Sequence, residues 1–236
     1  MNQRRLLVTA TTAGLLGSMM LGLPAASAHP SSPPGQDKTG QLNASLHELN
    51  DSGASGTASA VVRNQKIRSI EVEAHGLSPD APHAMHIHYG DDARNECPTA
   101  ADASNTRTYG TPRLSTADGL PAYGPIVVSL TTTGDTRPSS ALAVSRFPVS
   151  VGGSLDYSRT DINFTRVSGT GYTGAGGAGT PKQIADAIRD GEGVVVIHGV
   201  DYNDNGMYDF ESAGASELDP SLPAEATDPA ACGVLR

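Results

Sequence analysis

The sequence predicts an all-β domain, a sandwich or barrel of antiparallel strands with one short helix inserted in a loop. The 236-residue chain holds 27 Gly and 16 Pro but only 17% charged and 4% aromatic residues, a composition typical of strands joined by turns rather than of helical bundles. Apolar and polar residues alternate over 42–49, 56–62 and 67–74, as they do in half-buried strands. Asn, Asp, Ser and Gly residues, which favour turns, separate these stretches.

The rest of the chain continues this pattern with one interruption. Further strand-like stretches follow at 83–88, 124–130, 139–151 and 160–167. After a Gly-rich connector over 169–179, Thr180 and Pro181 form an N-cap and first turn, so a short helix is expected over 182–189. The apolar run 193–199 then predicts a core strand that carries one histidine near its end.

The N-terminus has the three parts of a secretory signal. Arg4 and Arg5 precede an apolar run that ends near Pro24 and the small residues Ala26-Ser27-Ala28. The run is short and rich in small residues, which disfavours the alternative of a membrane anchor. We therefore expect a signal over 1–28, a flexible arm over 29–40, and one β-domain over 41–236 in an extracytoplasmic protein with no stable membrane insertion.

Charge and cysteine content narrow the function further. Without Arg4 and Arg5 the chain has 14 basic and 25 acidic residues, a net charge of −11 that makes nucleic acid and anionic membranes poor partners. Its two cysteines, Cys97 and Cys232, are best interpreted in an exported protein as one disulfide.

A histidine pair marks a candidate metal site. His86 and His88 are two residues apart on a predicted strand, so both imidazoles project from the same face. A third imidazole, that of His198, would complete a site suited to copper or zinc. A single histidine is more often an ordinary surface or core residue, whereas for this pair metal binding is an equal alternative, and spacing alone does not decide between the two.

Four motifs in order resemble the copper/zinc superoxide dismutase family: His83-Ala84-Met85-His86-Ile87-His88, then Cys97, then Val194-Val195-Val196-Ile197-His198, then Ala231-Cys232-Gly233-Val234. The resemblance implies a Greek-key β-barrel or flattened sandwich and a disulfide between Cys97 and Cys232. It also implies that His86, His88 and His198 are copper ligands and that His83 is structural.

The sequence also departs from the family pattern. No histidine occurs from Pro98 to Ile197, so the zinc site and the histidine that bridges the two metals are missing. We therefore expect copper without zinc, with water, His75 or His83 in the fourth position. The family's anion-guiding arginine corresponds to Pro229 here, and eight acidic residues but one basic residue follow His198. A field of that sign repels an anion such as superoxide, so dismutase activity is expected to be impaired.

Three functions remain open from the sequence. The chain is a mononuclear copper enzyme of the superoxide dismutase type, a non-catalytic extracellular protein that binds or stores copper, or a scaffold module that keeps only the fold. The small ligand is accordingly superoxide or the copper ion itself. Retention of three copper ligands in two distant segments disfavours the scaffold.

An acidic loop follows His198. Asp201, Asn203, Asn205 and Asp209 occupy positions one, three, five and nine of a loop with Gly206 at position six, which resembles the first part of an EF-hand calcium loop. Ser212 stands where that loop requires a bidentate Glu. A calcium site is one interpretation, and an Asn-Gly turn in a solvated acidic loop is the other.

Overall fold

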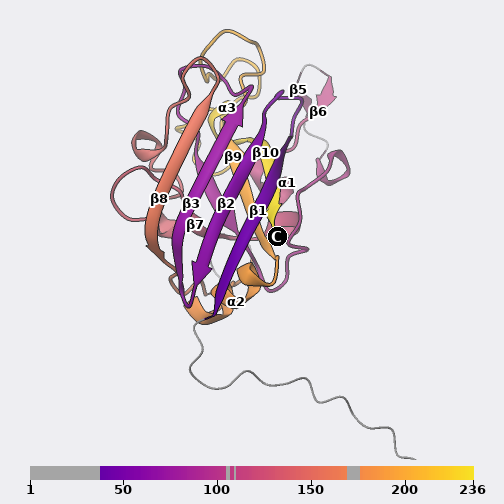
Figure 1. Ribbon diagram of the computed structural model, residues 1–236. Helices are drawn as coiled ribbons and strands as arrows, with labels where there is room; N and C mark the ends of the chain where they lie inside the picture. Colours follow the sequence, from indigo (N-terminus) through magenta and orange to yellow (C-terminus); the bar gives the residue numbers. More distant parts are fainter. Residues whose placement is uncertain (1–37, 105–106, 109, 169–175) are drawn as a thin grey trace, which may run out of the picture. The chain divides into compact units, whose positions relative to one another are not determined.

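Eight antiparallel strands form one curled sheet in the order β7, β4, β9, β10, β1, β2, β3, β8 (Figure 1). The computed structural model describes residues 38–104, 107–108, 110–168 and 176–236. Together with its few short helices, this sheet confirms the predicted all-β class. The predicted signal over 1–28 and residues 29–37 of the predicted arm lie outside the described residues.

The strands of this sheet are β1 (Thr39–Glu48), β2 (Ser55–Arg63), β3 (Lys66–His75), β4 (Met85–His88), β7 (Ile126–Ser129), β8 (Leu155–Asn163), β9 (Gly193–His198) and β10 (Pro229–Leu235). A separate pair joins β5 (Arg107–Thr108) to β6 (Thr111–Pro112). The helices are α1 (Thr116–Tyr123), α2 (Pro181–Arg189) and α3 (Ala224–Thr227), and single 3-10 turns are η1 (Ala100–Asp102), η2 (Pro138–Ser140) and η3 (Val144–Arg146).

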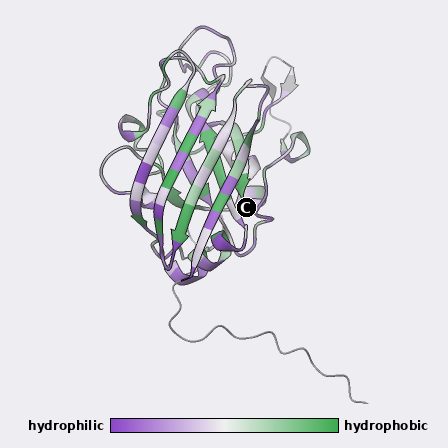
Figure 2. Ribbon diagram, viewed as in Figure 1, coloured by the Kyte–Doolittle hydropathy of each residue, from purple (hydrophilic) through white to green (hydrophobic). Residues whose placement is uncertain are grey.

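One half of the sheet, β1, β2, β3 and β8, has a buried face and a solvent-facing polar face. Alternate residues of β1 (Leu42, Ala44 and Leu46) are buried, whereas those between them are exposed. Figure 2 shows this alternation as bands of contrasting hydropathy along the strands. The period of two predicted these strands because successive side chains of a strand point to opposite faces.

The other half, β4, β7, β9 and β10, is buried on both faces. Residues of one parity, such as Met85, Ile87 and Ile197, belong to the main core inside the barrel. Residues of the opposite parity point outward, and there Val194 and Val196 pack with Leu120 of α1 in a second apolar cluster. Segments between the strands therefore cover the outer face of this half.

Side chains bridge the two edge strands of the sheet. Tyr157 on β8 donates its hydroxyl to the backbone carbonyl of Thr131, just beyond β7, at 3.2 Å. Arg159 reaches the same residue and donates to Thr131 Oγ1 at 2.8 Å and to the carbonyl of Gly134. These side-chain hydrogen bonds from β8 thus connect the two edges of the curled sheet.

The predicted helix is confirmed as α2. The Thr180 hydroxyl accepts a hydrogen bond from the Gln183 backbone N–H, and the Gln183 side chain returns to Thr180 in a capping box. Its apolar residues Ile184 and Ile188 are fully buried in the main core.

Three predicted boundaries were wrong. The range 139–151 is not a strand but contains η2 and η3, and Val149 and Val151 are 54% and 78% exposed. Pro138 directly precedes this stretch and Pro148 lies within it, and proline cannot donate to a strand ladder. The last β-strand of this region, β8, begins at Leu155 rather than 160, and β1 includes the final two residues of the predicted arm.

The predicted disulfide between Cys97 and Cys232 is confirmed. It connects the loop after β4 with β10, and Cys232 packs in the second apolar cluster beside Leu120 and Val196. No free cysteine is present among the described residues. Within that same part of the chain, no helix has the length and apolar character needed to span a membrane.

Candidate metal centre

Strand register brings three histidines together on the outer face of the barrel. His86 and His88 lie on β4, on the parity opposite to its core residues. Strand β9 pairs with β4 in antiparallel register, and the backbone N–H of His198 at its end donates to the carbonyl of Ala84. One ring nitrogen of each histidine lies within 4.8 Å of the others. The three predicted ligands therefore form one cluster.

Each imidazole is fixed by one backbone carbonyl. His86 Nε2 lies 3.1 Å from the carbonyl oxygen of Ala141, His88 Nδ1 lies 2.7 Å from that of Gly124, and His198 Nδ1 lies 2.6 Å from that of Thr227. A carbonyl accepts only from an N–H, so the proton of each neutral ring resides on that nitrogen and the other nitrogen carries a lone pair.

The three remaining nitrogens are buried and have no hydrogen-bond partner among the described residues. They are His86 Nδ1, His88 Nε2 and His198 Nε2. Buried polar atoms without partners are rare, and each costs free energy in the folded state. Three of them, one from each ring of a single cluster, are explained if they bind a metal ion.

The burial of these rings keeps them uncharged. Burial lowers the pKa of His88 to about 3 and that of His198 to about 4. Burial also lowers the pKa of His86 well below its usual range, and repulsion from the other two rings adds to the effect. Metal binding requires deprotonated imidazole, so the cluster is ready to bind a metal at neutral pH.

Helix α1 positions His88, although the sequence did not lead us to expect this helix. The Tyr123 ring lies 4.4 Å from the His88 ring, centroid to centroid, and its hydroxyl donates to the carbonyl of Thr116. Gly124 ends the helix at φ 79°, a conformation that favours glycine, and its carbonyl fixes His88. The capping box of Ser115 and Asp118 was the available sequence signal for this helix.

Neither histidine proposed for a fourth position joins the cluster. His83 is buried, with Nδ1 2.9 Å from the carbonyl oxygen of His198 and Nε2 3.0 Å from that of Ser78. It therefore connects the loop between β3 and β4 to the end of β9, as expected of the structural histidine that the resemblance implied. His75 is exposed at the end of β3, with Nδ1 3.3 Å from Ser154 Oγ. The expectation that either histidine is a fourth ligand does not hold.

The predicted calcium loop folds as a set of internal hydrogen bonds. Asp201 accepts from the backbone N–H groups of Asn205 and Gly206, and Asp209 accepts from the Asn205 amide at 2.6 Å. Asn203 Oδ1 also accepts from the Asn205 backbone. These bonds form the Asx turns of the second interpretation, and calcium binding stays a prediction.

A buried polar network beside the cluster was not predicted. The Glu225 carboxylate is fully buried and accepts from the backbone N–H groups of Tyr202 and Asp209, which secures the acidic loop. Asp228 is buried; it lies 2.9 Å from Arg113 Nε in an ion pair and accepts a hydrogen bond from the Tyr202 hydroxyl at 2.9 Å. Burial raises the pKa of the Asp228 carboxyl, and the Arg113 guanidinium opposes the rise.

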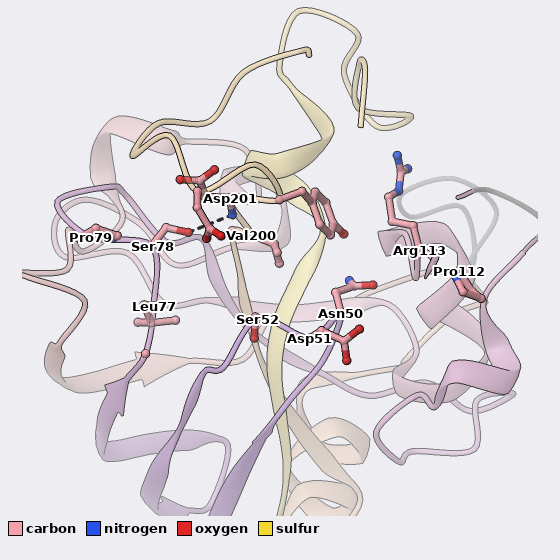
Figure 3. A pocket seen from close by; sticks show the side chains of 14 residues that line it. Asn50, Asp51, Ser52, Leu77, Ser78, Pro79, Pro112, Arg113, Val200 and Asp201 are labelled. Carbon is pink, nitrogen blue, oxygen red and sulfur yellow. Dashed lines mark hydrogen bonds between the residues drawn. The ribbon is translucent and has the colours of Figure 1, made fainter. Parts of the chain in front are cut away.

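An acidic depression lies next to the segment that follows His198. It has a volume of about 360 Å³ and walls from residues 50–52, 76–79, 112–113, 199–202 and 204. Figure 3 shows the side chains that line it. Across one wall the Asp201 backbone N–H donates to Ser78 Oγ. Asp51, Asp201 and Asp204 contribute carboxylates, whereas the guanidinium of Arg113 is paired with Asp228. The predicted excess of negative charge after His198 thus gathers partly at this depression.

Comparison of the chain with protein-family models and with curated proteins found no match to either.

Proposed function

We propose that this protein is an extracytoplasmic, mononuclear copper-binding protein of the superoxide dismutase-like type. The observation that carries the proposal is the convergence of three buried, partnerless imidazole nitrogens, those of His86, His88 and His198. The disulfide and the signal-like pattern at the N-terminus support export, because disulfides persist in oxidising compartments.

The donor set favours copper. Three neutral imidazoles suit a borderline metal, and among divalent first-row ions copper binds such ligands most tightly. Among the described residues, no thiolate and no carboxylate joins the three histidines. Copper held by imidazoles can exchange one electron, which is the chemistry that the bound metal would supply.

The protein contributes orientation to this site. The carbonyls of Ala141, Gly124 and Thr227 each hold the proton of one ring on the nitrogen that faces away from the metal position. Such outer partners raise the basicity of a ligand and fix its ring. The rings of Tyr123 and Phe147 pack against His88 and His86 and restrict their rotation.

We expect uptake of one copper ion per chain and no stoichiometric zinc. His86→Ala or His198→Ala should weaken copper binding at least about 100-fold, since even loss of an outer partner costs 10- to 100-fold. The matched control is His75→Ala, which removes an exposed histidine outside the cluster. Elemental analysis after dialysis, together with a competitive copper titration, measures both quantities.

The outcomes separate the proposed functions. Undiminished copper binding in both ligand variants would contradict the proposal, and a protein that binds no metal would favour the scaffold function. Uptake of zinc in preference to copper would support a metal site at the three histidines. It would contradict the one-electron chemistry proposed for that site.

Slow dismutation of superoxide is a separate expectation. Pro229 replaces the family's guiding arginine, Arg113 is paired with Asp228, and Asp201 and Asp204 add negative charge nearby. Loss of electrostatic steering reduces encounter rates by roughly 10-fold or more. Stopped-flow decay of superoxide with the copper-loaded protein tests this. A copper-dependent rate near the diffusion limit would instead favour the enzyme over copper storage.

A further inference from the structure

One narrow slot reaches the three-histidine cluster. It is a cavity of about 20 Å³ with the buried rings of His86 and His198 in its wall. The half-buried side chains of Leu142, Val144, Leu218 and Leu222 also line it, and their partial exposure marks the side open to solvent. A volume of about 10–15 Å³ accommodates one water molecule, so the slot holds one molecule of about that size.

The side chains of the slot offer no free hydroxyl donor to a ligand. Its polar members besides the histidines are Thr116 and Thr227. The Thr116 hydroxyl donates to the Thr227 carbonyl at 2.5 Å, and the Thr227 hydroxyl donates to Ser216 Oγ at 2.8 Å. Both hydroxyl protons are therefore already used.

The slot also has no charged lining residue in the described part of the chain. An anion that enters such an apolar passage loses its hydration, and this costs several kcal/mol unless hydrogen bonds or a cation replace the water. The metal would be a cation at the inner end, but the side chains between it and solvent supply neither replacement, so the cost falls on entry. An uncharged molecule of two atoms has little hydration to lose. The passage therefore discriminates by charge before a ligand reaches the histidines.

We propose that this slot is a ligand subsite for a small uncharged diatomic molecule next to the metal, and that it excludes small anions. The inference rests on the proposed function, because the metal at His86, His88 and His198 is what would retain the ligand. The cluster would then take uncharged ligands, whereas an anion-guiding channel favours negatively charged ones.

The test compares a neutral probe and an anionic probe in the same copper-loaded protein. Carbon monoxide added to the Cu(I) protein should give one infrared band of metal-bound carbon monoxide per copper. Azide added in millimolar excess to the Cu(II) protein should leave its electron paramagnetic resonance spectrum unchanged. Copper content is measured in every sample.

Two slot variants and one control test whether the probes reach the metal through the slot. Leu142→Trp fills the slot and should weaken carbon monoxide binding at least about 10-fold, whereas Leu218→Lys adds a cation at the mouth and should admit azide. Val151→Trp changes a residue that is 78% exposed and not part of the slot, so it should behave like the unaltered protein.

The failures are distinguishable. Copper-loaded protein that binds azide, or that fails to bind carbon monoxide, overturns this inference and leaves the proposed function intact. Equal carbon monoxide affinity in Leu142→Trp and Val151→Trp also overturns it. A protein that retains no copper overturns the proposed function and this inference together.

Discussion

Acidification below about pH 6 should destabilise the metal-free protein steeply. Burial holds the pKa of His88 near 3, that of His198 near 4 and that of His86 well below its usual range, so the folded rings stay neutral. In the unfolded chain they protonate near pH 6.5. Unfolding then takes up about three protons between roughly pH 6 and pH 4, which lowers the free energy of unfolding by about 4 kcal/mol per pH unit.

Two other buried groups have opposite effects on this slope. Burial lowers the pKa of His83, which adds to the proton uptake. Burial raises the pKa of the Asp228 carboxyl, so the folded state holds a proton that the unfolded chain has released, and its contribution to stability is lost as pH rises. Because their signs differ, the three ligand histidines dominate the slope.

Urea unfolding at a series of pH values measures the effect. His88→Gln should reduce the slope by about 1.4 kcal/mol per pH unit, whatever it does to stability at neutral pH. A slope that the substitution leaves unchanged would contradict the assignment of His88 as a neutral buried ring. Copper should move the onset of unfolding to lower pH, because a ligand that binds only the folded state stabilises it.

Loss of the disulfide should cost up to about 5 kcal/mol of folding free energy, because Cys97 and Cys232 are 135 positions apart and the bond restricts a long loop in the unfolded chain. This is a large share of the 5–15 kcal/mol by which domains are usually stable. The double variant Cys97→Ser, Cys232→Ser should unfold at much lower urea concentration than the oxidised protein.

Reduction of the unaltered protein provides the control. A reductant should lower its unfolding midpoint toward that of the double variant and should leave the double variant unchanged. A difference below about 1 kcal/mol between oxidised and reduced protein would mean that the unfolded chain gains little freedom when the bond breaks. Copper retention by the reduced protein would report whether β10 still orders the residues beside His198.

Local patterns predicted the parts of the fold in which one face meets solvent. The alternation in 42–49, 56–62 and 67–74 identified β1, β2 and β3 because only one face of each is buried. The same reasoning failed at 139–151, where tertiary contacts and prolines favour 3-10 turns over a ladder. It also missed α1, whose short helix has few apolar residues in a periodic pattern.

The candidate site was predictable in its ligands but not in its surroundings. Spacing identified His86 and His88, with His198 as a third imidazole, and the family resemblance implied that all three bind copper. The carbonyls that fix the rings belong to backbone at 124, 141 and 227, and backbone carbonyls carry no sequence signature. Likewise, no local pattern pairs Arg113 with Asp228, since 115 residues separate them and the fold alone brings them together.

The position of the three histidines on the outer side of the barrel has a consequence for the order of assembly. The interior that closes the barrel, with residues such as Met85, Ile87 and Ile197, contains none of the three ligands. The chain can therefore complete its curled sheet without waiting for an ion, unlike small domains that fold only around their metal. The supply of metal ion would then limit how many molecules are loaded, not how many are folded.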